Sequence, residues 1–116
     1  MGRAQIGAVA AGYTATWNSG SAGAVAAVFA QGAEGIILNG GTLWAGRGGV
    51  QAMAAGVFAE VPDLALTCDG VRMAGGPVLY LGTFTGHHAE TRRPLQVLGW
   101  EEWEMDRALP VAKSRG

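Results

Sequence analysis

The stretch WNSGSAGAVAAVFAQGAEGIILNGGTLWAGRGGVQAM, from Trp17 to Met53, sets the order of the first elements. Ser19-Gly20 ends one helix, and Ser21 is placed to cap a second helix through its side-chain oxygen. Two apolar runs then flank Asn39-Gly40-Gly41, a sequence that tolerates positive φ and favours a tight hairpin. The stretch therefore predicts two helices, a hairpin of two strands and the start of a third helix.

Helical spacing of apolar residues continues on both sides of this stretch. Upstream, the pattern i, i+3, i+4, i+7, i+11 predicts an amphipathic helix over Gln5 to Asn18. Downstream, a third helix is predicted at about Gly49 to Val61, and Pro62 ends it because its ring prevents another helical turn. The second helix presents an apolar face made by Val25, Val28 and Phe29.

After Pro62 the pattern changes to that of strands. Strands are predicted at residues 64–73, 77–88 and 94–105, with a turn at Ala74-Gly75-Gly76 and a last short strand at Val111 to Ser114. Helices that come first and an antiparallel sheet that follows are typical of the α+β class. At 116 residues, the chain is long enough for one domain, residues 1–116, and too short for two.

One carboxylate in the predicted strand GWEEWEMD, Gly99 to Asp106, lies on the wrong face. Alternate residues of a strand share a face, and Glu101 shares its face with otherwise apolar residues: Leu95, Val97, Gly99, Trp103 and Met105. A buried carboxylate is costly unless it is paired, hydrogen-bonded or protonated. Three explanations stay open: a polar group in a pocket, an ion pair with Arg47 or Arg115, or an outward position if a bulge shifts the register.

Composition excludes several classes of function. The net charge of −1 argues against nucleic-acid binding, which needs clustered Lys and Arg. A single cysteine, Cys68, rules out an intrachain disulfide and is expected in the core. No apolar run approaches the roughly 20 residues that a membrane span needs, so we expect a cytoplasmic protein. The histidines and the cysteine lack the spacing of metal ligands, and the glycine run Gly46-Arg47-Gly48-Gly49 has no P-loop lysine. We therefore expect neither metal nor cofactor.

Several of these pieces together resemble the SnoaL-like branch of the nuclear-transport-factor-2-like superfamily. They are Trp17-Asn18-Ser19-Gly20, Val28-Phe29-Ala30, the strand pair Ile36 to Trp44, and Gly46-Arg47, with GWEEWEMD and VAKSRG as the last two strands. The resemblance implies an α+β barrel shaped as a cone, in which a curved, mainly antiparallel sheet wraps three N-terminal helices around an apolar pocket. Members of the superfamily include enzymes and non-enzymatic binding domains, so the fold does not decide the function.

Comparison with ketosteroid isomerase, a member of this superfamily, suggests roles for two residues. Tyr13 precedes an Asn-x-Gly helix end, as the isomerase's tyrosine does, and Glu101 falls where that family has a protonated acid. Both family residues donate hydrogen bonds to a developing oxyanion. A neutral Glu101 at the pocket floor would explain its inward position. The isomerase's general base, however, corresponds to Ile37, which cannot take a proton, so we do not expect ketosteroid isomerisation by that mechanism.

Other residues supply a substitute base or the pocket wall. His87, His88 and Asp69 are the candidate bases, although GHHAETRR also has the composition of a polar hairpin tip. The residues predicted to line the pocket, or to fill the core beside it, are apolar: Trp17, Ile37, Met53, Phe58, Phe84, Val97, Trp103 and Met105.

Three functions fit this sequence. The first is an isomerase, cyclase or lyase acting on a hydrophobic cyclic substrate, with Glu101 and Tyr13 as donors of protons or hydrogen bonds. The second is a protein that binds a hydrophobic small molecule without converting it. The third is an association module that uses its sheet face, with Leu98 and Trp100 as outward apolar anchors. Because relatives commonly dimerise through that face, the resemblance implies a homodimer.

Overall fold

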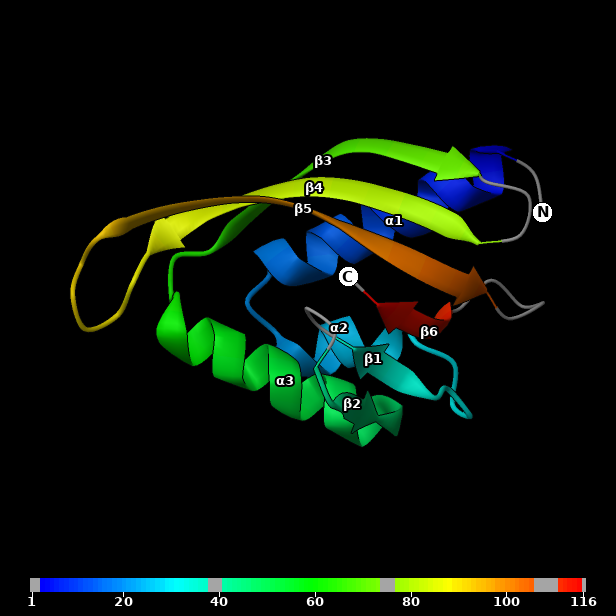
Figure 1. Cartoon of the computed structure of the whole chain (residues 1–116), viewed down its shortest axis with the longest axis horizontal. Helices are drawn as coiled ribbons and strands as arrows, with labels where there is room; N and C mark the ends of the chain where they lie inside the picture. Colours follow the sequence, from blue (N-terminus) through cyan, green and yellow to red (C-terminus); the bar gives the residue numbers. More distant parts are fainter. Residues whose placement is uncertain (1–2, 38–40, 74–76, 106–110, 116) are drawn as a thin grey trace.

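The computed structural model describes residues 3–37, 41–73, 77–105 and 111–115, which form three helices and six strands (Figure 1). The helices are α1 (Arg3–Asn18), α2 (Ala22–Ala27) and α3 (Gly46–Glu60). The strands are β1 (Gly35–Ile37), β2 (Leu43–Ala45), β3 (Ala65–Met73), β4 (Val78–His87), β5 (Pro94–Met105) and β6 (Val111–Arg115). This mixture of helix and sheet confirms the predicted α+β class.

The six strands form one sheet in the order β2-β1-β6-β5-β4-β3. Every neighbouring pair is antiparallel except β1 and β6, which run parallel. The long strands β3, β4 and β5 curve over the helices, while the short strands β1, β2 and β6 lie near α2 and α3 (Figure 1). The sheet is therefore mainly antiparallel, and its concave side faces the helices.

The third helix begins three residues earlier than the sequence predicted. Gly46 has a φ of 65°, and its N–H donates to the Glu34 carbonyl oxygen, so the turn between β2 and α3 is tight. A Cβ atom at Gly49 would lie 2.6 Å from the carbonyl carbon of Trp44. The glycine run therefore does not prevent a helix. It lets α3 begin directly after β2 and pack against it. Asn39 and Gly40, at the predicted hairpin tip, and the predicted turn at residues 74–76 lie outside the described residues.

Asn18 ties the end of α1 to the sheet. Its Oδ1 accepts the Leu66 N–H at 2.7 Å, and its Nδ2 donates to the Leu66 carbonyl oxygen at 2.9 Å. The side-chain amide thus takes the place of a neighbouring strand along β3. Because only an amide presents an acceptor and a donor in this arrangement, the asparagine after Trp17 fixes where α1 sits on the sheet.

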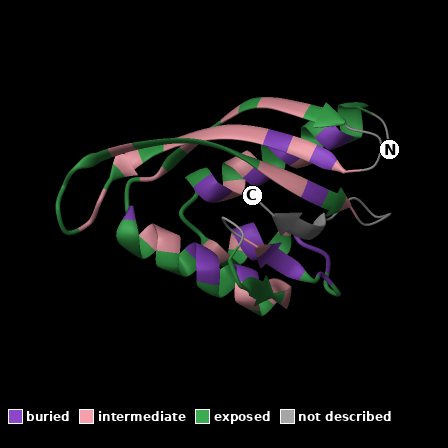
Figure 2. Cartoon of the chain, in the orientation of Figure 1, coloured by how far each residue is buried: buried purple, intermediate pink, exposed green. Residues whose placement is uncertain are grey.

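The core lies between the three helices and the concave face of the sheet, at the end of β4 and β5 away from their hairpin (Figure 2). Tyr13, Tyr80 and Trp103 form its aromatic centre: Tyr80 stacks on Trp103 with ring centroids 5.1 Å apart, and Tyr13 meets both rings edge-on. Such aromatic pairs add about 0.5–1.5 kcal/mol each beyond simple burial. No helix in the described part of the chain combines the length and apolar character needed to cross a membrane.

Candidate small-molecule site

A cavity of about 570 Å³ lies between the helices and the concave face of β3, β4 and β5. Its wall is mostly apolar and comes from six elements and from the segment before β3. The residues that line it are Tyr13 and Trp17 from α1, Ile36 from β1, Met53 and Val57 from α3, Leu64 and Leu66 before and in β3, Tyr80, Gly82 and Phe84 from β4, and residues 97–101 of β5. Facing glycines on β4 and β5, Gly82 and Gly99, leave room at its middle.

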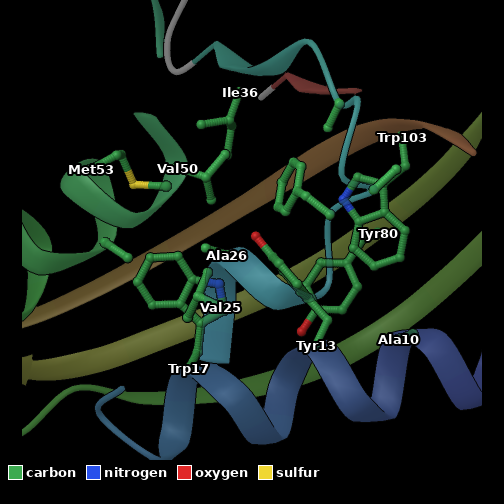
Figure 3. Packing of buried hydrophobic residues seen from close by; sticks show 14 of the residues in the cluster. Ala10, Tyr13, Trp17, Val25, Ala26, Ile36, Val50, Met53, Tyr80 and Trp103 are labelled. Atoms are coloured by element: carbon green, nitrogen blue, oxygen red, sulfur yellow. The ribbon is translucent and has the colours of Figure 1, made fainter. Parts of the chain in front are cut away.

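Tyr13 and Glu101 meet in the wall of this cavity. The Tyr13 hydroxyl donates to the Glu101 carboxylate, with its oxygen 2.8 Å from both Oε1 and Oε2. Tyr13 rises from the same face of α1 as Ala10 and Trp17 (Figure 3), because these residues are three or four positions apart. Glu101 lies on the cavity-facing side of β5, directly opposite Tyr80 on β4.

Trp103 holds the same carboxylate from the core side. Its indole Nε1 donates to Glu101 Oε1 at 3.2 Å. An indole N–H can only donate, so Glu101 is the acceptor in this contact. Two donors, the Tyr13 hydroxyl and the Trp103 indole, therefore point at one carboxylate. The sequence predicted Glu101 as a donor; in this contact set it accepts.

Tyr80 is held by a second polar contact next to the first. The Thr14 hydroxyl donates to the Ala10 carbonyl oxygen at 2.8 Å and lies 2.6 Å from the Tyr80 hydroxyl. Since a threonine hydroxyl has one hydrogen, the bond to Ala10 leaves Thr14 as the acceptor and Tyr80 as the donor. Two adjacent residues of α1 therefore each hold one side chain of the sheet. Tyr13 bonds to Glu101, and Thr14 bonds to Tyr80.

Both tyrosines are kept neutral over the physiological range. Burial, followed by the nearby negative charge of Glu101, raises the pKa of Tyr13 well above its ordinary value of 10.0. Burial likewise raises the pKa of Tyr80 to about 12. Among the described residues that line the cavity, Glu101 is therefore the one acidic or basic side chain besides the two tyrosines.

Four of the residues predicted for the pocket wall line the cavity: Trp17, Met53, Phe84 and Val97. Val97 is exposed and, with its exposed neighbours Leu98 and Trp100, belongs to the part of β5 where the cavity opens.

The other four predicted residues do not line it. On β1, Ile36 faces the cavity, and Ile37 points to the opposite side because successive residues of a strand alternate. On α3, Met53 and Val57 are four residues apart and share the cavity-facing side, whereas Phe58 is turned away and packs on Trp17. Trp103 and Met105 lie beyond Glu101 along β5, where Trp103 fills the core and Met105 packs against it.

None of the three candidate bases lines the cavity. His87 and His88 stand at the far end of β4, where His87 contacts Asp63. Asp69 is exposed and lies where the register between β3 and β4 shifts, and its Oδ2 accepts from the Thr83 hydroxyl at 2.6 Å. The three candidate bases therefore lie outside the cavity, and the position of His87 and His88 agrees with the hairpin-tip alternative.

Arg47, a proposed ion-pair partner of Glu101, has a different role. Its Nε donates to the Phe29 carbonyl oxygen at 2.7 Å, and its terminal nitrogen reaches the Ala27 carbonyl oxygen at 3.5 Å. These carbonyls stand at and just after the C-terminus of α2, so the guanidinium caps that helix.

Two residues of the site, Tyr80 and Thr14, were not predicted from the sequence. Phe84 was identified as inward-facing, and the period of two along β4 places Gly82 and Tyr80 on the same face, so the pattern contained the signal for Tyr80. Thr14 had no such signal. Its contact depends on how α1 packs across the sheet, which no local spacing specifies.

Comparison with known proteins agrees with this architecture. A search of curated proteins by sequence finds no match. A hypothetical protein from Catenulispora acidiphila with a ketosteroid isomerase-like fold, crystallised with trimethylamine, is 18% identical with a TM-score of 0.82, covering 92% of this chain and 82% of its own. AclR, a putative hydroxylase from Streptomyces galilaeus, is 15% identical with a TM-score of 0.81, covering 98% and 88%.

A third solved structure carries the family name itself. A putative SnoaL-like polyketide cyclase from Jannaschia sp. is 16% identical with a TM-score of 0.71, covering 85% of this chain and 76% of its own. The sequence model of the SnoaL-like domain matches residues 9–108, which is most of the chain. On that match, this chain belongs to the SnoaL-like domain family.

Proposed function

We propose that this protein binds a hydrophobic, cyclic small molecule in the cavity, with Tyr13 and Glu101 engaging the polar group of the ligand. The observation that carries the proposal is a hydrogen-bonded Tyr–Glu pair in the wall of an otherwise apolar cavity. A volume of about 570 Å³ lies within the range typical of small-molecule sites, which are largely apolar with few polar groups.

The pair offers two kinds of contact to a ligand. A ligand hydroxyl can donate to Glu101, whereas a ligand carbonyl can accept from Tyr13 or from Glu101 in its protonated form. Desolvation by a bound apolar ligand favours the protonated form of the acid. Glu101 would then polarise a carbonyl or hydroxyl, as an isomerisation, cyclisation or elimination requires.

Any proton transfer in this cavity would have to pass through Glu101. The tyrosines beside it have raised pKa values, and the described lining residues include no His, Asp or Lys. A reaction that needs an acid and a separate base therefore has less support than one in which a single carboxyl removes and returns the proton. Binding without turnover is the second candidate, and the same lack of a second base favours it.

Two further points support a ligand-binding role. The Catenulispora acidiphila protein of similar fold was crystallised in complex with trimethylamine, a small molecule. The cavity also opens beside the exposed apolar side chain of Val97 on β5, which gives an apolar ligand a matching entrance.

A thermal-shift screen of apolar cyclic ketones, lactones and phenols against the wild type and Glu101→Gln tests the proposal. A ligand at about 100 times its dissociation constant stabilises the native state by roughly 2.7 kcal/mol. For a domain of this size the melting temperature would rise by on the order of 10 °C. We expect hits whose shifts shrink in Glu101→Gln. A panel without hits would count against ligand binding, and hits that ignore the substitution would count against the role of Glu101.

A further inference from the structure

A second hollow, of about 640 Å³, lies at the turn after α3. The β4–β5 hairpin projects beside this end of α3 (Figure 1). Its residues come from the turn after α3 and from the start of the hairpin: Pro62, Asp63, His87, His88, Ala89 and Arg92. We name it the hairpin cleft. None of these residues lines the apolar cavity, so the hairpin cleft is separate from the small-molecule site.

Backbone packing fixes the two sides of the hairpin cleft against each other. The Ala89 N–H donates to the Glu60 carbonyl oxygen at 2.7 Å, which joins the hairpin to the end of α3. A Cβ atom at Gly86 would collide with Val61 Cγ1 and lie 3.0 Å from Asp63 Oδ1. Only glycine allows this approach of β4 to the turn after α3. The backbone that carries the side chains of the cleft is therefore held in place by these contacts.

The carboxylate of the hairpin cleft is already engaged. Asp63 Oδ1 accepts the His87 backbone N–H at 2.7 Å, and Oδ2 lies 2.6 Å from His87 Nδ1. The bond from the His87 ring, with the bond from its backbone, holds the pKa of Asp63 below its ordinary value of 3.8, so the carboxylate is ionised at neutral pH. With Asp63 accepting at Nδ1–H, the His87 ring keeps its second nitrogen for another partner.

His88 is oriented by its own backbone. Its Nδ1 lies 3.3 Å from the Glu90 N–H nitrogen and 3.5 Å from that of Thr91, and it accepts from both. In a neutral imidazole one nitrogen accepts and the other carries the hydrogen. The His88 proton is therefore on Nε2, and His88 presents a hydrogen-bond donor.

Arg92 adds a charged donor. Its guanidinium has no hydrogen bond or ion pair with any described residue, and it lines the cleft. Its backbone has a φ of 61°, held by the bond from its N–H to the His88 carbonyl oxygen at 2.9 Å. This left-handed conformation is unfavourable for an arginine, and such strain is often found where a side chain has a function.

We propose that the hairpin cleft is a binding site for an oxyanion, a phosphate or carboxylate group of a ligand. The guanidinium of Arg92 presents paired N–H donors that match such oxygens, and His88 Nε2–H adds a neutral donor. The one carboxylate at the cleft, Asp63, has both oxygens bonded to His87, which reduces its repulsion of an anion. Nothing in this proposal depends on what the apolar cavity binds.

Titration of the ¹⁵N-labelled chain with sodium phosphate and with sodium acetate, followed by NMR, tests the site. Sodium chloride at the same ionic strength measures simple screening. Arg92→Gln removes the charged donor, and Arg93→Gln is its matched control, because Arg93 is the adjacent residue, carries the same charge and does not line the cleft. His88→Asn removes Nε2–H while an amide oxygen can still accept the two backbone N–H groups. Melting curves without anion check that each variant folds.

We expect saturable shifts at the hairpin cleft with one or both oxyanions and none with chloride. Arg92→Gln should weaken binding about tenfold, the loss of roughly one charge-assisted hydrogen bond. Arg93→Gln should change the affinity by less than about twofold, because it alters only distant charge. Shifts that stay linear in anion concentration, or an equal loss in the two arginine variants, would overturn the proposal. The relative affinity for phosphate and acetate identifies which group the site prefers.

Discussion

Tyr13 and Tyr80 are the two tyrosines of this chain, and both hydroxyls lie in the aromatic centre beside Glu101. Burial raises the pKa of Tyr13 well above 10.0 and that of Tyr80 to about 12. A titration of absorbance at 295 nm should therefore show no tyrosinate step near pH 10 in the folded protein. Urea-unfolded protein is the control, and both residues should ionise there near pH 10.

The same pKa shifts determine how stability changes with pH. A folded-state pKa above the unfolded value means that the native state binds protons more tightly. The stabilisation is complete below about pH 10 and is lost as the pH rises toward the folded pKa values. We expect alkaline unfolding to begin above about pH 10 and to coincide with tyrosine ionisation. A reversible step near pH 10 without unfolding would place at least one tyrosine in solvent and contradict the described contacts.

At the level of residues, sequence reasoning placed Tyr13 and Glu101 on inward faces, because helix and strand periods are local properties. Their hydrogen bond joins residues far apart in the chain, and the direction of that bond depends on Trp103 and on the packing of α1 across the sheet. The sequence consequently indicated which polar groups to examine but assigned Glu101 the donor role. The candidate bases taken from the sequence lie outside the cavity. Which strand residues come near Glu101 depends on how the strands curve, and this is not a local property.

At the level of elements, two adjacent glycines of α3 offer a matched pair of substitutions. A Cβ atom at Gly48 meets nothing within 4 Å, whereas one at Gly49 would lie 2.6 Å from the Trp44 carbonyl carbon. Gly48→Ala should stabilise the protein by about 0.5–1 kcal/mol through helix propensity. Gly49→Ala should destabilise it by about 1–3 kcal/mol, because backbone atoms must move. Urea unfolding of both variants measures these free energies.

Equal free energies for the two glycine variants would show that α3 does not start against β2. Sequence patterns predicted the existence and order of the helices and long strands, since Ser21, Pro62 and the alternation of β5 are local signals. They missed the first residues of α3 because the glycines there have helix-breaking propensity. Contact with Trp44, a tertiary effect, overrides that propensity.

At the scale of the whole molecule, we propose that two copies associate through the outer face of the sheet. Leu98 is 73% exposed and Trp100 is 54% exposed on β5, and apolar side chains of this size are usually covered in stable assemblies. Light scattering after size exclusion should give twice the 11.9 kDa of the chain. Trp100→Lys should shift the mass toward the monomer because it buries a charge in the interface.

Val97→Lys is the control for this experiment, because it adds the same charge on the same strand, where alternation places Val97 and Trp100 on opposite faces of the sheet. It should leave the mass unchanged. A wild type that elutes as a monomer at every concentration would contradict the dimer proposal. The exposed Leu98 and Trp100 would then need another explanation.

We propose that Tyr13 and Glu101 act together as the polar end of a ligand site. A double-mutant cycle on affinity tests this pairing most directly: calorimetry of the best screening hit with the wild type, Tyr13→Phe, Glu101→Gln and the double variant. Because the two side chains are bonded at 2.8 Å, we expect each single variant to weaken binding and the effects to be non-additive by about 0.5–3 kcal/mol. Unchanged affinity in both single variants, or strictly additive losses, would contradict it.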